Sequence, residues 1–216
     1  MVRSYQREIA TFDSFYAVEY ATAMKLGDIA QVIPGYAFRG AIKPDKTGDT
    51  FVLQAKDLVQ GSPIKGVETL TPIALDVSYS SFLQKHDVLL VARGMKAGSF
   101  RSTVFMAEDV NIIASASVHI IRPVTSNVIP EYLSHYLNSK KGQDDLTQIV
   151  TGSYIGAIPR RSLEQMRIPI PDLNKQKAIV DIFKNIQAQQ KLLDRKKELK
   201  QQIIEATFKN ITRHHD

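Results

Sequence analysis

Residues 174–210 read NKQKAIVDIFKNIQAQQKLLDRKKELKQQIIEATFKN, and this stretch decides how the chain is organised. It contains no Gly or Pro and is dominated by Lys, Gln, Glu, Leu, Ile and Ala, which apart from Ile are strong helix formers. The stretch therefore predicts one continuous helix, about 50 Å long at roughly 1.5 Å per residue.

Apolar residues on this helix recur at close to alternating spacings of three and four, interrupted by Gln189, Lys196 and one register slip between them. That spacing is typical of a coiled-coil seam. The stripe is too long to be buried on a small domain, so we predict a partner helix; packing on its own domain is the alternative. The predicted contact residues are Ile179, Ile182, Ile186, Leu192, Leu193, Leu199 and Ile203.

The first 130 or so residues have a different character. They hold most of the Gly and β-branched residues, in short runs separated by turn sequences such as Pro34-Gly35 and Arg93-Gly94. The predicted strands lie at Thr50–Gln54, Asp87–Val91, Thr103–Met106, Ile112–Ala114 and Ser117–Arg122. Short strands without long helices between them favour an antiparallel or mixed sheet, with a distorted barrel as one possible form.

Helices begin at Pro130, because proline suits a first helical turn and Tyr132, Leu133, Tyr136 and Leu137 form an apolar stripe behind it. A loop of small residues at 151–156, a short helical turn after residue 159 and an extended stretch at 168–171 follow. The expected fold class is α+β. A strand-rich globular domain with short helices spans residues 1–173, and a long helix that pairs as a coiled coil spans 174–216.

Composition excludes several classes of protein. Hydrophobic residues make up 44% and charged residues 23%, as in an average soluble protein, and the absence of Cys excludes disulfides and thiolate metal sites. No apolar run approaches the roughly 20 residues of a membrane span, and residues 1–10 lack the apolar core of a signal peptide. We expect a soluble, cytoplasmic protein without a membrane partner.

The net charge of +6 and the pI near 9.4 make nucleic acid a plausible partner. From residue 174 onward, ten Lys and Arg stand against five Asp and Glu, whereas the first 173 residues hold eighteen against seventeen. Any DNA site on the domain must therefore be a local patch. The charge of the helix is equally compatible with a role in solubility.

No arrangement of residues points to catalysis. Gly94 and Gly98 match neither a dinucleotide nor a phosphate-loop spacing, and no Gly-x-Ser-x-Gly elbow occurs. His119 lies in an apolar strand and is expected to be a satisfied core residue, while His214 and His215 belong to a terminal tail. The interpretation is a binding protein, not an enzyme, without a metal or cofactor.

A series of short motifs carries a more specific indication. They are Ile129-Pro130-Glu131-Tyr132-Leu133, Leu137-Asn138-Ser139, Thr151-Gly152-Ser153, Ile158-Pro159, Leu163, Ile168-Pro169-Ile170-Pro171, Leu173, Gln176 and Ile179. In this order they resemble the end of a target recognition domain and the conserved helix of the specificity subunits of type I restriction–modification systems. More loosely, Lys25–Ile29 and Lys85–Gly94 are similar to the opening and the central strand of that domain.

The resemblance implies a non-catalytic specificity subunit that reads double-stranded DNA and binds modification (methyltransferase) and restriction subunits. Full-length members carry two recognition domains and two long helices, whereas this sequence shows one of each, and Lys175 stands where the family often has an acid. Two copies that pair antiparallel through the helix would form a homodimer reading a bipartite palindromic site. An alternative is a degenerate homologue that binds partner subunits but no DNA.

Three loops combine positive charge, small residues and turns: 39–46, 93–101 and 151–161. Arginine can bond two acceptors of guanine, so the candidate base readers are Arg39, Arg93 and Arg101. Candidate phosphate contacts are Lys43, Lys46, Lys96, Arg160 and Arg161. Ser99, Ser153 and Tyr154 are candidates for either role. For each of these residues the alternative is an ordinary solvated side chain.

Overall fold

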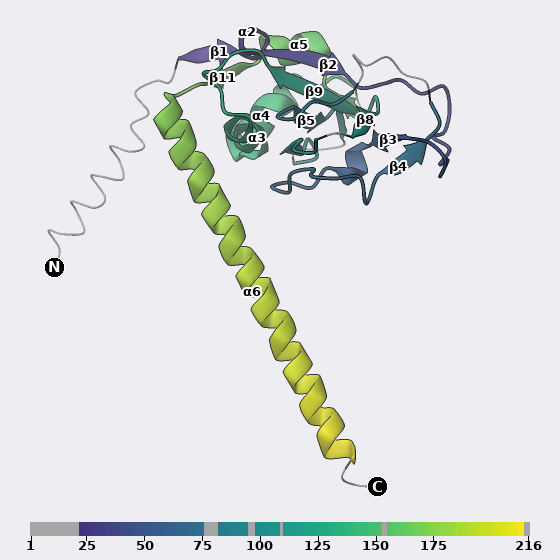
Figure 1. The fold of residues 1–216 in the computed structure, drawn as a ribbon. Helices are drawn as coiled ribbons and strands as arrows, with labels where there is room; N and C mark the ends of the chain where they lie inside the picture. The colour runs from purple at the N-terminus through teal and green to yellow at the C-terminus, as the bar shows by residue number, and fades with distance from the viewer. Residues whose placement is uncertain (1–21, 76–81, 95–97, 109, 153–154, 214–216) are drawn as a thin grey trace, which may run out of the picture. The chain divides into compact units, whose positions relative to one another are not determined.

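The computed structural model describes residues 22–75, 82–94, 98–108, 110–152 and 155–213, with side chains up to residue 209. The chain divides into two compact units, Met1–Lys177 and Ala178–Asp216. The first is rich in short strands and the second is helical (Figure 1). This arrangement confirms the predicted α+β class with a long C-terminal helix.

A four-stranded antiparallel sheet forms the centre of the first unit. Its strands, in spatial order, are β2 (Ala30–Pro34), β9 (Val118–Pro123), β5 (Val88–Val91) and β7 (Ser102–Val104). All four residues of β5 are buried, which explains their uninterrupted apolar sequence VLLV. The strands predicted at 87–91, 103–106 and 117–122 are confirmed within one or two residues.

The remaining described strands form three smaller sheets. The first contains β4 (Thr71–Ile73), β3 (Thr50–Leu53) and β8 (Asn111–Ala114), and β3 runs parallel to β8. The other two pair β1 (Ala23–Lys25) with β11 (Arg167–Pro169), and β6 (Arg93–Gly94) with β10 (Gly156–Ala157). Strand directions are therefore mixed, as predicted, and none of the described sheets closes into the barrel that the sequence also allowed.

One apolar core lies between the central sheet and the three-stranded sheet. Leu89 and Ile120 come from the central sheet, Leu53 and Ile112 come from the other, and Phe105 lies beyond β7. A smaller cluster of Val52, Ile73 and Ile113 occupies the opposite face of the three-stranded sheet, because neighbouring residues of a strand point to opposite faces. Burial of each such large side chain contributes about 1.5–3 kcal/mol. The other face of the central sheet is buried as well, through Val88, Leu90 and Ile121.

A buried ion pair crosses the central sheet. The Arg122 guanidinium donates to both carboxylate oxygens of Asp87, at 2.8 and 2.7 Å, and the Asp87 side chain is only 1% exposed. Asp87 also accepts the backbone N–H of Gln84 at 2.7 Å. The pair therefore fixes the turn before β5 to the end of β9.

Short helices complete the first unit. They are α2 (Leu26–Ile29), the 3-10 helix η1 (Ala55–Asp57), α3 (Pro130–Asn138), α4 (Lys140–Gln148) and α5 (Arg160–Gln165). The helix predicted at Pro130 is confirmed, with proline in its first turn and Tyr132, Leu133 and Leu137 buried. The Tyr132 hydroxyl donates to the carbonyl of Pro169 at 2.6 Å, and burial raises the pKa of Tyr132 to about 12.

The long helix α6 spans Leu173–Arg213, so the predicted helix is confirmed. Its first turn is fixed by Gln176, whose side chain is fully buried. The Gln176 amide accepts the N–H of Ile129 and donates to the carbonyls of Asn127 and Pro171, each at 2.8 Å. One side chain thus connects the start of the helix to the segment between β9 and α3.

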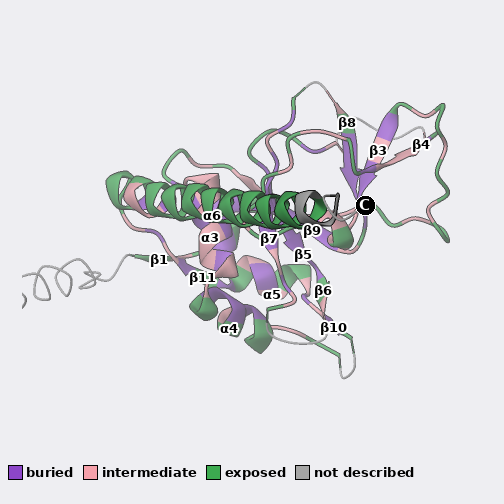
Figure 2. Ribbon diagram, turned by 90° about the horizontal axis from the view of Figure 1, so that it is seen from below, coloured by how far each residue is buried: buried purple, intermediate pink, exposed green. Residues whose placement is uncertain are grey.

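Beyond this turn, α6 is exposed over most of its length (Figure 2). Six of the seven predicted contact residues are exposed, with Leu192 at 71% and Ile203 at 65%; Ile179 is partly buried. Pairing with another helix remains a prediction. Despite its length, α6 is too polar to cross a bilayer, and no other helix among the described residues could cross one either.

We predict that Arg122→Met lowers the free energy of unfolding by roughly 3–5 kcal/mol, because it leaves the buried Asp87 carboxylate without its counter-charge. Denaturant unfolding at pH 7 measures this loss. Lys85→Met is the matched control, since it removes the lysine of the exposed pair with Glu108 and should leave stability nearly unchanged. Equal losses in the two variants would contradict the prediction.

Candidate nucleic-acid interface

Several strand termini meet at one end of the central sheet. β2 ends at Pro34, opposite His119 near the start of β9, and β5 ends at Val91, opposite Val118. β7 begins at the same end, at Ser102, which pairs with Leu90. The segments that follow β2 and β5 therefore leave the sheet at the same end, and the first two predicted loops arise there (Figure 1).

The third predicted loop is joined to this end by backbone pairing. β10 pairs with β6, with Gly156 opposite Gly94 and Ala157 opposite Arg93. The N–H of Ile158 then donates to the carbonyl of Ala92 at 2.9 Å. The described parts of the second and third loops thus lie together. The first loop leaves the sheet at the same end and then runs to β4, where the N–H of Asp45 donates to Pro72 O at 2.9 Å.

The first loop starts from a close backbone approach. A Cβ atom on Gly35 would lie 2.0 Å from the carbonyl oxygen of Ser115, so only glycine fits. The next residue, Tyr36, donates its N–H to Ala114 O at 2.7 Å and accepts the N–H of Ala116 at 2.8 Å. The ring of Tyr36 meets that of Phe38 edge to face, with centroids 4.9 Å apart. The loop therefore leaves the sheet in a fixed direction.

The basic side chains of this loop, Arg39, Lys43 and Lys46, are all exposed and make no hydrogen bond or ion pair within the described residues. Asp45 shapes the tip of the loop, since its carboxylate accepts the hydroxyl of Thr47 at 2.7 Å and the N–H of Thr47 at 2.9 Å. These two hydrogen bonds lower the pKa of Asp45. Lys46 lies between Asp45 and Thr47, and its side chain is exposed to solvent.

In the second loop, Arg93 is exposed on β6, whereas Arg101 is bound to the protein's own backbone. Its Nε donates to Leu58 O at 3.0 Å and its Nη2 donates to Ala55 O at 3.1 Å. Ser99 is half-buried and fills the space where a side chain on Gly94 would lie. The predicted contact Lys96 lies outside the described residues.

The third loop leads into α5. Arg160 is exposed and its Nε donates to Glu164 Oε1 at 2.7 Å, an ion pair along the helix. Arg161 is exposed and makes no such contact within the part of the chain that the structure describes. The predicted contacts Ser153 and Tyr154 lie outside that part.

His119, on β9, holds the third loop from beneath. Its Nε2 donates to Ile158 O at 2.7 Å, while its buried Nδ1 has no hydrogen-bond partner within the described residues. Burial lowers the pKa of His119, although the bond to Ile158 raises it, and the nearby charge of Arg160 lowers it further. The histidine is therefore a buried core residue, as predicted, but only one of its two ring nitrogens is hydrogen-bonded within the described residues, whereas the sequence led us to expect both to be satisfied.

Two side-chain amides that the sequence reasoning did not single out as site residues hold the return of the second loop. Asn138, at the end of α3, accepts the N–H of Ser102 at 2.9 Å and donates to its carbonyl at 2.8 Å. Gln143, on α4, accepts the N–H of Gly98 at 3.0 Å and donates to Phe100 O at 2.9 Å. Nothing in the sequence separates these amides from the exposed ones, because only the fold shows that Gln143 is buried and that Asn138 is partly buried against β7.

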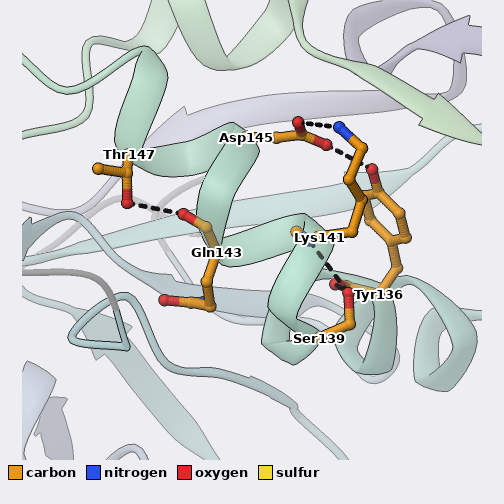
Figure 3. A network of polar contacts seen from close by, with 7 residues as sticks. Tyr136, Ser139, Lys141, Gln143, Asp145 and Thr147 are labelled. Atoms are coloured by element: carbon orange, nitrogen blue, oxygen red, sulfur yellow. Dashed lines mark hydrogen bonds and ion pairs between the residues drawn. The ribbon is translucent and has the colours of Figure 1, made fainter.

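The corner between α3 and α4 gives Gln143 a rigid base (Figure 3). Ser139 caps α4 by accepting the N–H of Gly142 at 3.0 Å, and a Cβ on Gly142 would lie 2.0 Å from Tyr136 O. The Tyr136 hydroxyl donates to Asp145 at 2.7 Å, and Lys141 forms an ion pair with the same carboxylate. Burial and the Asp145 charge together raise the pKa of Tyr136.

The chemistry of this end is that of a binding surface with exposed cations on fixed loops. Within the described ranges, no group of three or more His, Asp or Glu side chains is placed to hold a metal ion. Arginine and lysine at such positions can bond base edges and phosphates, and backbone anchoring limits the entropy lost on binding.

The family model for the type I restriction modification DNA specificity domain matches residues 19–204. The match covers most of the chain, and the chain belongs to this family. A search of curated protein sequences found no match.

Solved structures show the same fold. The HsdS subunit from Thermoanaerobacter tengcongensis matches with a TM-score of 0.57 and 20% identity, over 82% of this chain and 40% of that chain. A chain from a study of complex assembly and conformational transition of the type I R-M system matches with a TM-score of 0.55 and 22% identity, over 80% and 40%. The chain therefore spans about two-fifths of the length of these matched chains.

We predict that stability falls as the pH is lowered from about 7.5 to 5.5. Because the pKa of His119 is lowered below 6.5 in the folded protein, the unfolded chain binds the proton more readily. The contribution of neutral His119 is therefore complete above pH 6.5 and is lost as the pH falls toward the folded pKa. Thermal unfolding across this range measures the effect.

The control is His119→Gln, which keeps an N–H donor for Ile158 and does not titrate. It should have a flatter stability profile over the same pH range. A profile as steep as that of the unmodified protein would assign the pH dependence to other groups.

Proposed function

We propose that this chain reads a specific sequence of double-stranded DNA and thereby targets a type I restriction–modification assembly, without catalysing a reaction itself. One observation carries the proposal. Three basic segments that are distant in sequence begin or pair at one end of the central sheet, and hydrogen bonds hold their backbone there. Residues 1–173 hold eighteen Lys and Arg against seventeen Asp and Glu, so the exposed cations of these loops stand out on a body that is nearly neutral as a whole. A local cationic end suits a DNA contact.

The exposed arginines Arg39 and Arg93 are the proposed base readers, and Lys43, Lys46 and Arg161 the proposed phosphate contacts. Arg160 shares its charge with Glu164 and is a weaker candidate for phosphate. Lys96, Ser99, Ser153 and Tyr154 stay predicted contacts of the same loops. The guanidinium of Arg101 donates to two backbone carbonyls, so Arg101 is not among the proposed base readers.

Selection from a random pool of duplex DNA, with and without the modification subunit at stated salt, tests the proposal. We expect enrichment of one sequence motif. No enrichment under either condition, while the modification subunit still binds the chain, would support the degenerate homologue that binds partner subunits alone.

Substitutions at the proposed surface should separate two kinds of contact. Arg39→Ala and Arg93→Ala should each relax the preference at particular base pairs, by about 1–3 kcal/mol. Lys43→Ala and Lys46→Ala should weaken all sequences alike and reduce the slope of log K against log salt by about 0.9 for each lost phosphate contact. Lys85→Ala, before β5 at the other end of the sheet, is the control and should change neither quantity.

We further propose that α6 pairs antiparallel with the same helix of a second copy, and that modification and restriction subunits dock on this helical part. The exposed apolar residues Ile182, Ile186, Leu192 and Ile203 support pairing, because their spacing suits a helical seam. A dimer related by a two-fold axis would read a bipartite palindrome.

Sedimentation or light scattering tests this dimer. We expect twice the 24.2 kDa chain mass, at least on the selected DNA. Leu199→Lys with Ile203→Lys should return the protein to a monomer, since both substitutions charge the seam. A monomer mass for the unmodified chain with and without DNA would refute the dimer.

A further inference from the structure

A fourth segment, residues 54–62, reaches the same end of the protein, although no motif marked it. β3 runs parallel to β8 with Leu53 opposite Ala114, so both strands end together. The N–H of Ser115 donates to Leu53 O at 2.8 Å, and the N–H of Ala55 donates to the Ser117 hydroxyl at 3.2 Å. The segment therefore starts beside the turn that leads into β9, where the first two loops also begin.

Three anchors hold the backbone of this segment. Arg101 donates to the carbonyls of Ala55 and Leu58 at 3.1 and 3.0 Å, and the Thr103 hydroxyl donates to Ser62 O at 2.7 Å. Both anchoring residues lie at the return of the second loop into β7. The side chains of Gln54 and Asp57 cap η1, and Leu58 is buried. The exposed side chains of the segment are those of Lys56, Val59, Gln60 and Ser62.

A tight turn at Val59–Ser62 forms the outer part of the segment. The N–H of Ser62 donates to Val59 O at 3.1 Å, and Gly61 has a φ of +74°, in the left-handed region that favours glycine. Gln60 occupies the corner before it and is exposed, as is Lys56 on η1. Val59, at 59% exposure, is an apolar side chain without cover beside them. The turn thus displays an amide, a cation and an apolar group on a fixed backbone.

We propose that residues 54–62 are a fourth DNA-reading segment, in which Gln60 contacts a base edge, Lys56 contacts a phosphate and Arg101 is the residue that positions them. The proposal rests on the DNA recognition proposed above. An amide on a rigid corner can bond the N6 and N7 atoms of adenine together, so adenine is the base expected at this position. Arg101, at the return of the second loop, couples that loop to the fourth segment.

The first test compares Gln60→Ala and Lys56→Ala with the unmodified full chain, on the DNA that this chain selects and with the modification subunit where binding needs it. Gln60→Ala should reduce discrimination at one base pair by about 5- to 150-fold. Lys56→Ala should weaken binding to every sequence and lower the salt slope by about 0.9. Gln84→Ala and Lys85→Ala are matched controls, since both residues are exposed in the turn before β5 at the opposite end.

The second test concerns Arg101 and uses Arg101→Lys and Arg101→Met. Lysine keeps the positive charge but lacks the planar fork that reaches two carbonyls. If Arg101 positions the turn, both variants relax the preference at the base pair that Gln60 reads, and the salt slope stays unchanged. If lysine restores full discrimination, or if methionine lowers the salt slope by about 0.9, Arg101 contacts DNA directly and its positioning role is refuted.

The outcomes separate this inference from the function on which it rests. Selection of no DNA sequence by the unmodified chain refutes DNA recognition as a whole. Selection of a sequence, with Gln60→Ala and Lys56→Ala indistinguishable from Gln84→Ala and Lys85→Ala, refutes only the fourth segment. Because Gln60 and Lys56 are exposed, their substitution does not endanger folding, and the comparison remains valid.

Discussion

The hydrogen bonds of the turn at residues 115–117, between β8 and β9, hold together the end of the central sheet at which the predicted loops begin. Peptide groups in such a packed turn need hydrogen-bond partners, and three segments distant in sequence supply them. Ser115 donates to Leu53 at the end of β3, Ala116 donates to Tyr36 after β2, and Ser117 accepts from Ala92 after β5. One small turn therefore gathers the segments that carry Arg39, Arg93 and the 54–62 turn. The requirement for glycine at position 35 has the same origin, because no side chain fits between that residue and Ser115.

Side chains that act as backbone partners stabilise the loops around this turn. Asn138 and Gln143 satisfy the backbone of the second loop, Arg101 satisfies two carbonyls of the fourth segment, and His119 satisfies Ile158 in the third. A buried polar group that loses its hydrogen-bond partner costs roughly 1–3 kcal/mol. The loops and the side chains that hold them therefore stabilise one another. No hydrogen bond from the exposed side chains of Arg39 and Arg93 to the loop backbone occurs within the described residues. They can differ from one protein to another while the anchors stay in place.

The comparisons with solved structures concern the fold alone. The fold is shared with solved chains that are only 20–22% identical to this one. Backbone anchoring specifies a scaffold, whereas the bases read by a scaffold depend on a few exposed side chains. The fold can therefore be retained at low identity, and the base contacts that we propose for Arg39, Arg93 and Gln60 do not follow from the fold itself.

The sequence by itself determined the elements whose evidence is local. The helix of α6 follows from residues without Gly or Pro, the helix at Pro130 from its apolar stripe, and the core strands and the buried His119 from short apolar runs. The basic loops were also predictable, because charge and turn residues are visible in sequence. Only the tertiary structure decided which segments meet: the parallel pairing of β3 with β8, the short pairing of β6 with β10, and the bonds from Arg101 to Ala55 and Leu58. These depend on hydrogen bonds between residues some 40 to 65 positions apart. Such bonds form only when the whole sheet is assembled, so a local pattern could place Arg101 in a basic loop but could not show that its guanidinium binds the protein's own backbone.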